Sequence, residues 1–181
     1  MRLLPGTAAP ECTLTTVRGE STPLTALRGA PVWLAFSRFA ACPLCNFRIH
    51  QIVGQWPQRF AGTRLRLFVI FQSPAAKLAE YVATQEAPFD LVADPTMDLY
   101  RLFRVERSLP KMVSFHALKV AVSAVAEGLV VPAGPDGPIT RVPADFLIDP
   151  SGVIRVARYG ENIADHIALD RVADFVERHG G

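Results

Sequence analysis

Two cysteines, Cys42 and Cys45, stand at the junction between an apolar run and a long amphipathic stretch. The run Pro31–Phe36 has the length and composition of a buried strand, and the stretch from Asn46 to Phe60 has helical spacing. Two thiols at the start of a helix, just after a strand, form a dithiol that can close to a disulfide. The sequence therefore predicts a thiol redox site at this junction.

The composition predicts one folded domain over residues 1–181, because 50% of the residues are hydrophobic and only 20% are charged. The formal net charge of +2 is scattered, with no basic tract that would imply nucleic acid or a membrane surface as a partner. The N-terminus, Met1–Gly6, has no secretory apolar core, so a cytoplasmic location is expected. Reductants keep thiols free there, so the Cys pair is expected to be catalytic or metal-binding rather than a structural staple.

Apolar periodicity predicts strands that alternate with helices. Strands are expected at Glu11–Thr16, Val32–Ser37, Leu65–Phe71, Asp90–Ala93, Ala144–Asp149 and Val153–Tyr159. Helical segments are expected at Leu24–Gly29, after the Cys pair, from Ser73 to about Gln85, at Thr96–Phe103 and at Ile167–Arg178. The helix after the Cys pair is expected to bend or end early at Gly54 and Pro57. Ser73 and Asp165 are expected to be the N-caps of the helices that they precede. The alternation implies parallel strands with helical crossovers. The pattern is less regular over 105–140, with helical spacing at 115–127 and a Gly/Pro-rich loop at 128–137.

The order of these elements is that of thioredoxin, and four segments resemble peroxiredoxins. Gly6–Leu14 resembles their G-x-x-A-P-x-F-x-L opening, Leu27–Phe36 their L-R-G-x-P-V-x-L-x-F segment, and Phe146–Arg155 their F-x-I-D-x-x-G-x-I-R hairpin. The stretch Phe36–Asn46 is similar to F-x-R-G-x-W-C-P-x-C-N in the peroxiredoxin-like branch of the alkyl hydroperoxide reductase/thiol-specific antioxidant family. The resemblance covers nearly the whole chain except about 105–140. It implies an α/β domain with a thioredoxin-like fold, a central mixed sheet flanked by helices, and a peroxiredoxin-type N-terminal strand extension.

Several positions depart from the family pattern. Ala35 and Phe39 occupy the Pro and Thr positions of P-x-x-x-T-x-x-C, so the Thr that helps to orient peroxide is missing. Pro143 stands three residues before Phe146, where peroxiredoxins have Arg and thioredoxins place a cis-proline. The buried acid of thioredoxin would fall on Phe36 and is absent. Peroxide and protein disulfide therefore both stay open as the oxidant.

The expected chemistry centres on Cys42, at the N-cap of the predicted helix. Unsatisfied backbone N–H groups and the positive end of the helix dipole favour its thiolate. Pro43 suits the first helical position because it lacks an N–H, and Cys45 lies one turn on, where it can resolve a sulfur species formed on Cys42. Arg38, four residues before Cys42, either stabilises this thiolate or is a solvated loop arginine.

The resemblance also implies supporting residues. The Val142–Pro143 bond is expected to be cis and to face the Cys pair, so that the backbone of Val142 can hydrogen-bond an incoming extended chain. His116 and His166 are further candidates as proton carriers. Cys12 replaces an apolar residue of the family and is expected to be a buried core thiol.

The resemblance implies a thiol-dependent oxidoreductase, a peroxiredoxin-like antioxidant that reduces peroxides without a cofactor or metal. A thioredoxin- or glutathione-type thiol would recycle it. The alternatives are a thioredoxin-like protein disulfide oxidoreductase and a non-catalytic redoxin-fold binding or redox-sensor module, whose 105–140 segment would form a partner or homodimer surface. A zinc-bound Cys pair is a third interpretation, for which His50 is the nearest histidine in the sequence.

Overall fold

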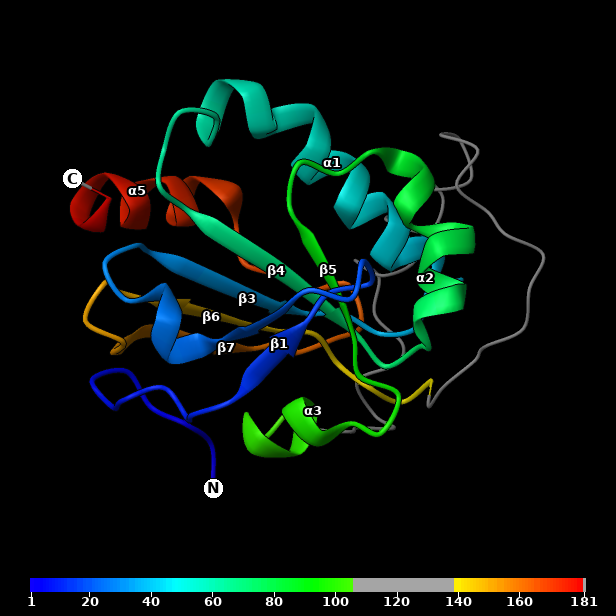
Figure 1. Cartoon of the computed structure of the whole chain (residues 1–181), viewed down its shortest axis with the longest axis horizontal. Helices are drawn as coiled ribbons and strands as arrows, with labels where there is room; N and C mark the ends of the chain where they lie inside the picture. Colours follow the sequence, from blue (N-terminus) through cyan, green and yellow to red (C-terminus); the bar gives the residue numbers. More distant parts are fainter. Residues whose placement is uncertain (106–138, 181) are drawn as a thin grey trace.

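The protein is described from a computed structural model, which covers residues 1–105 and 139–180 (Figure 1). Its central sheet has the strand order β5-β4-β3-β6-β7. The strands are β3 (Val32–Phe36), β4 (Arg66–Phe71), β5 (Asp90–Ala93), β6 (Ala144–Ile148) and β7 (Ile154–Tyr159). Strands β3, β4 and β5 run parallel, and β6 and β7 are antiparallel to their neighbours. The mixed sheet confirms the predicted fold class.

Helices cover both faces of this sheet (Figure 1). They are η1 (Leu24–Leu27), α1 (Pro43–Arg59), α2 (Ala75–Tyr81), η2 (Ala83–Gln85), α3 (Asp98–Leu102) and α5 (Leu169–His179). Side chains of α1, α2 and α5 pack with Trp33 and Leu67 on one face. Side chains of η1 and α3 pack with Leu34, Phe36 and Phe68 on the other. Burial on both faces explains why β3 reads as a continuous apolar run.

The N-terminal segment crosses the second face and reaches both edges of the sheet. Ala8 pairs with Val153 beside β7, and Thr16 pairs with Val92 on β5. Between these contacts lies β1 (Thr13–Thr15), which forms a two-stranded sheet with β2 (Ser21–Pro23). This segment is the N-terminal extension that the resemblance implies.

Three predictions about helix ends are wrong. Helix α1 does not end at Gly54 or Pro57; Pro57 lies near the end of the helix, so its missing N–H and its ring disturb only the final turns. Ser73 does not cap α2, because its hydroxyl accepts a 2.7 Å hydrogen bond from the backbone N–H of Ala40. Asp165 does not cap α5, because its carboxylate pairs with Arg158 instead.

The predicted helical pattern at 115–127, the loop at 128–137 and His116 lie outside the described residues. No described helix has both the length and the apolar character that crossing a membrane requires.

Candidate active site

The Cys pair lies where the sequence predicts it, at the start of α1 and beyond the end of β3. Cys42 is the N-cap residue and Pro43 occupies the first turn of the helix. The side chain of Asn46 holds the preceding loop, since its Nδ2 donates to the carbonyls of Ala40 (2.7 Å) and Cys42 (3.1 Å). The approach to the helix is thus fixed by hydrogen bonds on both its sides, from Asn46 and from Ser73.

Arg38 contacts both cysteines. Its Nη1 donates to Cys42 Sγ and its backbone N–H donates to Cys45 Sγ, each over 3.4 Å. The guanidinium is buried and also donates to the carbonyl oxygen of Ile139 at 2.6 Å. The interpretation of Arg38 as a solvated loop arginine is therefore wrong.

The two thiols have opposite tendencies to ionise. A hydrogen bond from Cys45, together with the charge of Arg38, lowers the pKa of Cys42 to about 7 against the effect of burial. The backbone N–H groups of Cys45 and Leu44, in the first turn of α1, act in the same direction. Burial raises the pKa of Cys45 well above its ordinary value, and the neighbouring Cys42 adds to this rise. Near neutral pH a large share of Cys42 is therefore thiolate, while Cys45 stays a thiol.

Both thiols are enclosed. Cys42 and Cys45 are each 1% exposed, and both are free rather than joined in a disulfide. The structure thus shows a reduced, shielded pair to which a large reactant has little direct access.

Val142 and Pro143 precede β6, whose first residue pairs with Phe36 at the end of β3. The Val142–Pro143 bond is trans, so the expected cis bond is not found; trans is the more stable state of most X-Pro bonds. Val142 is 1% exposed, and the Pro143 carbonyl accepts a hydrogen bond from the Gly160 N–H at 2.8 Å. The expected docking of an extended chain on this backbone is therefore not supported.

His166 belongs to a buried polar group at Asp145, on β6, rather than to the dithiol. Asp145 accepts hydrogen bonds from Trp33 Nε1 and from the Ile167 N–H, both at 2.9 Å, and its Oδ2 lies 3.9 Å from His166 Nδ1. Burial lowers the pKa of His166, which keeps the ring neutral. Asp145 on β6 is paired with Ala35 on β3. The fold therefore has a buried acid on β6, the strand next to β3, where the thioredoxin pattern would place its acid at Phe36.

Cys12 is half-buried, rather than fully buried, against the apolar core on the face of the sheet that η1 and α3 cover. Burial raises the pKa of this thiol to about 11, so it is a poor nucleophile at neutral pH. Among the residues that the structure describes, no group of three or more Cys, His, Asp or Glu side chains has the arrangement of a metal site.

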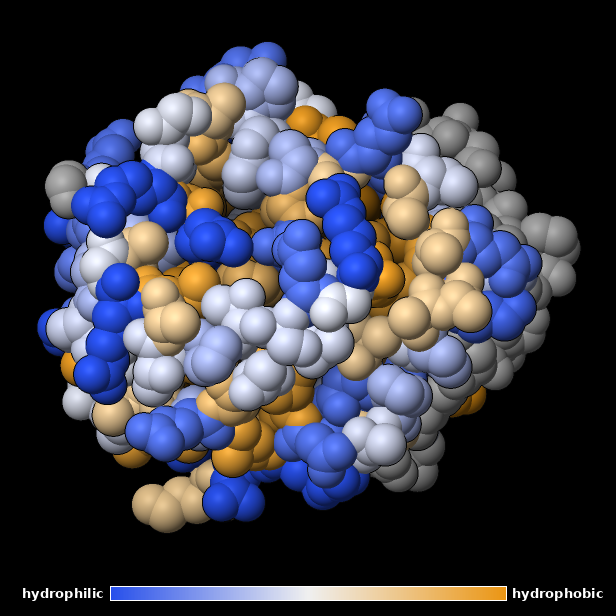
Figure 2. Space-filling view, viewed as in Figure 1, coloured by the Kyte–Doolittle hydropathy of each residue, from blue (hydrophilic) through white to orange (hydrophobic). Residues whose placement is uncertain are grey.

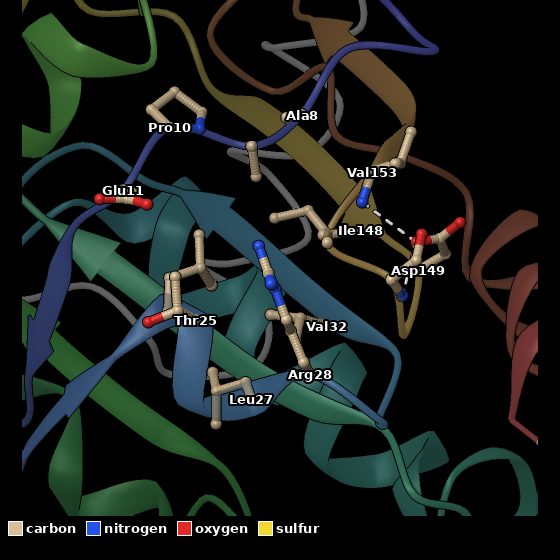
Figure 3. A pocket seen from close by; sticks show the side chains of 14 residues that line it. Ala8, Pro10, Glu11, Thr25, Leu27, Arg28, Val32, Ile148, Asp149 and Val153 are labelled. Atoms are coloured by element: carbon tan, nitrogen blue, oxygen red, sulfur yellow. Dashed lines mark hydrogen bonds between the residues drawn. The ribbon is translucent and has the colours of Figure 1, made fainter.

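A cavity of about 210 Å³ lies at the opposite end of β3 from the dithiol (Figure 3). Val32 and Ile148 form part of its floor, and Arg28 extends into it from the end of η1. Arg28 and Glu11 at its rim are exposed, so an ion pair with either would add little binding energy.

Polar side chains dominate the surface on the face seen in Figure 2, and apolar side chains show in recesses between them.

Sequence reasoning missed Tyr100, which also reaches the loop before α1. Its hydroxyl lies 2.8 Å from the Ser37 carbonyl oxygen and 2.9 Å from that of Ile70. The sequence carries no signal for this contact, because Tyr100 falls within an ordinary amphipathic helix pattern far from the Cys pair.

The fold and the dithiol together define a thiol-dependent redox protein with thioredoxin-like architecture, an oxidoreductase. The model of the AhpC/TSA family matches residues 5–157, most of the chain, and the protein belongs to that family. None of the curated proteins matches the chain.

Solved structures share the fold at low sequence identity. The peroxidoxin BcpB from Mycobacterium tuberculosis is 17% identical with a TM-score of 0.67, and 96% of each chain is covered. A putative thiol:disulfide interchange protein DsbE from Chlorobium tepidum is 17% identical with a TM-score of 0.62, and 99% of each chain is covered. A yeast mitochondrial 1-Cys peroxiredoxin is 13% identical with a TM-score of 0.68, covering 97% of this chain and 75% of that one.

Proposed function

We propose that the protein is a peroxidase in which Cys42 attacks the peroxide and Cys45 resolves the product. The observation that carries this proposal is the enclosed pair, in which Arg38 donates to both sulfurs while the pKa of Cys42 falls to about 7. A thiolate at neutral pH is the nucleophile that such chemistry needs.

The reaction divides into two steps. The Cys42 thiolate attacks one oxygen of ROOH, the O–O bond breaks, and with one proton taken up the products are a sulfenic acid on Cys42 and ROH. The Cys45 thiol then attacks the Cys42 sulfur, which closes the 42–45 disulfide and releases the sulfenic hydroxyl with the thiol proton as water. Arg38 replaces the missing Thr as a donor beside Cys42 and opposes the negative charge that develops there.

The burial of the pair supports a small oxidant. Cys42 is 1% exposed, so a hydroperoxide needs far less rearrangement to reach its sulfur than a protein disulfide does. The trans bond at Pro143 and the burial of Val142 also remove the backbone surface expected for an extended chain.

A thiol must return the disulfide to the dithiol. We propose a thioredoxin- or glutathione-type reductant, which a cytoplasmic setting would supply. The similar yeast mitochondrial 1-Cys peroxiredoxin is itself described as having a thiol resolving mechanism via glutathione and thioredoxin systems.

The test is the rate at which the fully reduced protein consumes hydrogen peroxide, with the intact mass of the product as the second readout. We expect a rate far above that of an ordinary free thiolate and a loss of two hydrogens at the pair. Cys42→Ser should abolish the reaction, whereas Cys45→Ser should consume one equivalent and stop at a sulfenic acid that dimedone traps. Cys12→Ser is the matched control and should react like the wild type. A wild-type rate no higher than that of a free thiolate would refute the peroxidase.

A second candidate is a protein disulfide oxidoreductase. One observation favours it: a recess of about 180 Å³ lies beside the first turn of α1, lined by apolar Leu44, Phe47, Ala164 and Ile167 and by polar Arg48, Gln51 and His166. A segment of a partner protein with both apolar and polar side chains could rest there. Slow reaction with peroxide, together with rapid formation of the 42–45 disulfide from an oxidised protein substrate, would select this function.

A further inference from the structure

Tyr100 is a fully buried tyrosine of α3. Its hydroxyl hydrogen-bonds to the loop before the dithiol. The hydroxyl lies within hydrogen-bond distance of the carbonyl oxygens of Ser37 and Ile70. Burial raises the pKa of Tyr100 well above its ordinary value, and Cys45 in its ionised form would act in the same direction. The phenol therefore stays protonated and is a hydrogen-bond donor at any pH at which the protein works.

One peptide group joins Tyr100 to the resolving cysteine. The Ser37 carbonyl accepts from the Tyr100 hydroxyl, whose single proton it shares with the Ile70 carbonyl. The N–H of the same peptide group, that of Arg38, donates to Cys45 Sγ. Neighbouring backbone bonds hold the rest of this turn: the Ser37 N–H donates to Ile70, and the Gln72 N–H donates to the Arg38 carbonyl. A donor on the carbonyl side of a peptide group fixes its plane and strengthens its N–H as a donor.

We propose that Tyr100 is a positioning residue for the dithiol, which aims the Ser37–Arg38 peptide at Cys45 and thereby also the Arg38 side chain at Cys42. The inference deepens the proposed peroxidase function and rests on it for its kinetic consequence, though not for its effect on thiol ionisation. The Tyr100 hydroxyl bonds to backbone carbonyls rather than to either sulfur, so its action passes through Arg38.

The first experiment measures the rate of Cys42 alkylation against pH in the reduced protein, with the alkylated site identified by mass spectrometry. In Tyr100→Phe the Ser37–Arg38 peptide group loses its fixed orientation and both hydrogen bonds that Arg38 donates to the sulfurs weaken. We therefore expect the midpoint of the Cys42 alkylation profile to rise by about half to one pH unit. Tyr159→Phe is the matched control, since its hydroxyl is also buried and donates to a carbonyl, that of Phe103, at 2.9 Å. The control should keep the wild-type midpoint.

A purely structural role for Tyr100 predicts equal midpoints in both variants and the wild type, and this outcome would overturn the proposal. If Tyr100→Phe fails to fold, 3-fluorotyrosine at position 100 keeps the shape and makes the hydroxyl a stronger donor. The midpoint should then fall below that of the wild type, and an unchanged midpoint would count against the proposal.

The second experiment measures overoxidation under increasing hydrogen peroxide. A second peroxide can oxidise the Cys42 sulfenic acid to a sulfinic acid, releasing water, and this competes with attack by Cys45. Tyr100→Phe should slow the attack, so half-maximal overoxidation should need about three- to tenfold less peroxide than in the wild type. An unchanged threshold would contradict the proposed effect on resolution. If the wild type does not react with peroxide, the proposed function fails, while the alkylation profile still decides the role of Tyr100.

Discussion

Arg38 serves two sulfurs with two different parts of one residue. The side chain faces Cys42 and the backbone faces Cys45, so the charge lies beside the proposed attacking sulfur and the neutral donor beside the resolving one. This division acts in the direction of the pKa difference, to which the hydrogen bond from Cys45 to Cys42 and the burial of Cys45 contribute most. The residue thus distinguishes two cysteines that lie one helical turn apart.

We predict that Arg38→Met raises the midpoint of Cys42 alkylation from about pH 7 by about one pH unit. The guanidinium stabilises the charged form, so its loss raises the pKa and decreases the thiolate fraction at every pH below the new midpoint. The alkylation rate at pH 7 should fall about fivefold, a loss that vanishes above about pH 9. Arg28→Met, far from the pair, should leave the profile unchanged. An unshifted midpoint in Arg38→Met would show that the helix and Cys45 alone set the ionisation of Cys42.

At this scale the sequence predicts the cysteines, Pro43 and the proximity of Arg38, because all four lie within one short segment. It does not predict Tyr100, which is 63 positions away from Ser37 in the chain and is brought to it only by the packing of α3. The structure places His166 beside Asp145 and buries Val142, and the rest of the fold, not the local sequence, decides these surroundings.

The β6–β7 hairpin shows how an element is held by a single carboxylate. Asp149 Oδ1 accepts from the backbone N–H groups of Ser151 (2.9 Å) and Val153 (3.0 Å), and Oδ2 pairs with Arg155 Nε at 2.6 Å. Burial by itself would raise the pKa of Asp149, but the Ser151 hydroxyl, which donates to Oδ1 at 2.6 Å, and these other donors lower it to about 2. The turn between the two strands therefore depends on an ionised Asp149.

We predict that Asp149→Asn lowers the free energy of unfolding at pH 7 by about 1 to 3 kcal/mol. Because the folded pKa lies below the unfolded one, the contribution is complete above about pH 4 and is lost as pH falls towards 2. Urea unfolding at pH 7 and at pH 2.5 should show a large and then a small difference from the wild type. Asp170→Asn, at an exposed pair with Arg59, is the control and should change stability by less than about 0.5 kcal/mol. A pH-independent loss in Asp149→Asn would mean that charge plays no part.

Over the whole molecule, periodicity and motif order predict the fold well, since the strands of the central sheet and its mixed character are those expected, although the pattern does not predict β2. The errors in the predicted helix caps occur where one side chain can hydrogen-bond either to the helix end or to a residue elsewhere in the fold. Ser73 and Asp165 are good capping residues by type, but tertiary partners at Ala40 and Arg158 engage them. Local sequence states which hydrogen bonds a residue can make, and only the assembled molecule decides which one forms.

Within residues 1–105 and 139–180, the outer strands β5 and β7 each have one side without a strand neighbour, and the N-terminal segment occupies part of both. Gly6 and Ala8 bond beside β7, while Thr16 and Val17 bond to β5, so one segment of chain protects two distant edges. Exposed edges invite strands of other molecules to pair with them. We expect a variant that lacks residues 1–17 to self-associate, with light scattering that increases with protein concentration, whereas deletion of residues 1–4 should leave the protein as dispersed as the full chain. Equal scattering of the two variants would show that the edge strands do not need the N-terminal segment to prevent self-association. Self-association of the shorter variant alone would mean that the N-terminal extension protects the protein against aggregation as well as completing its fold.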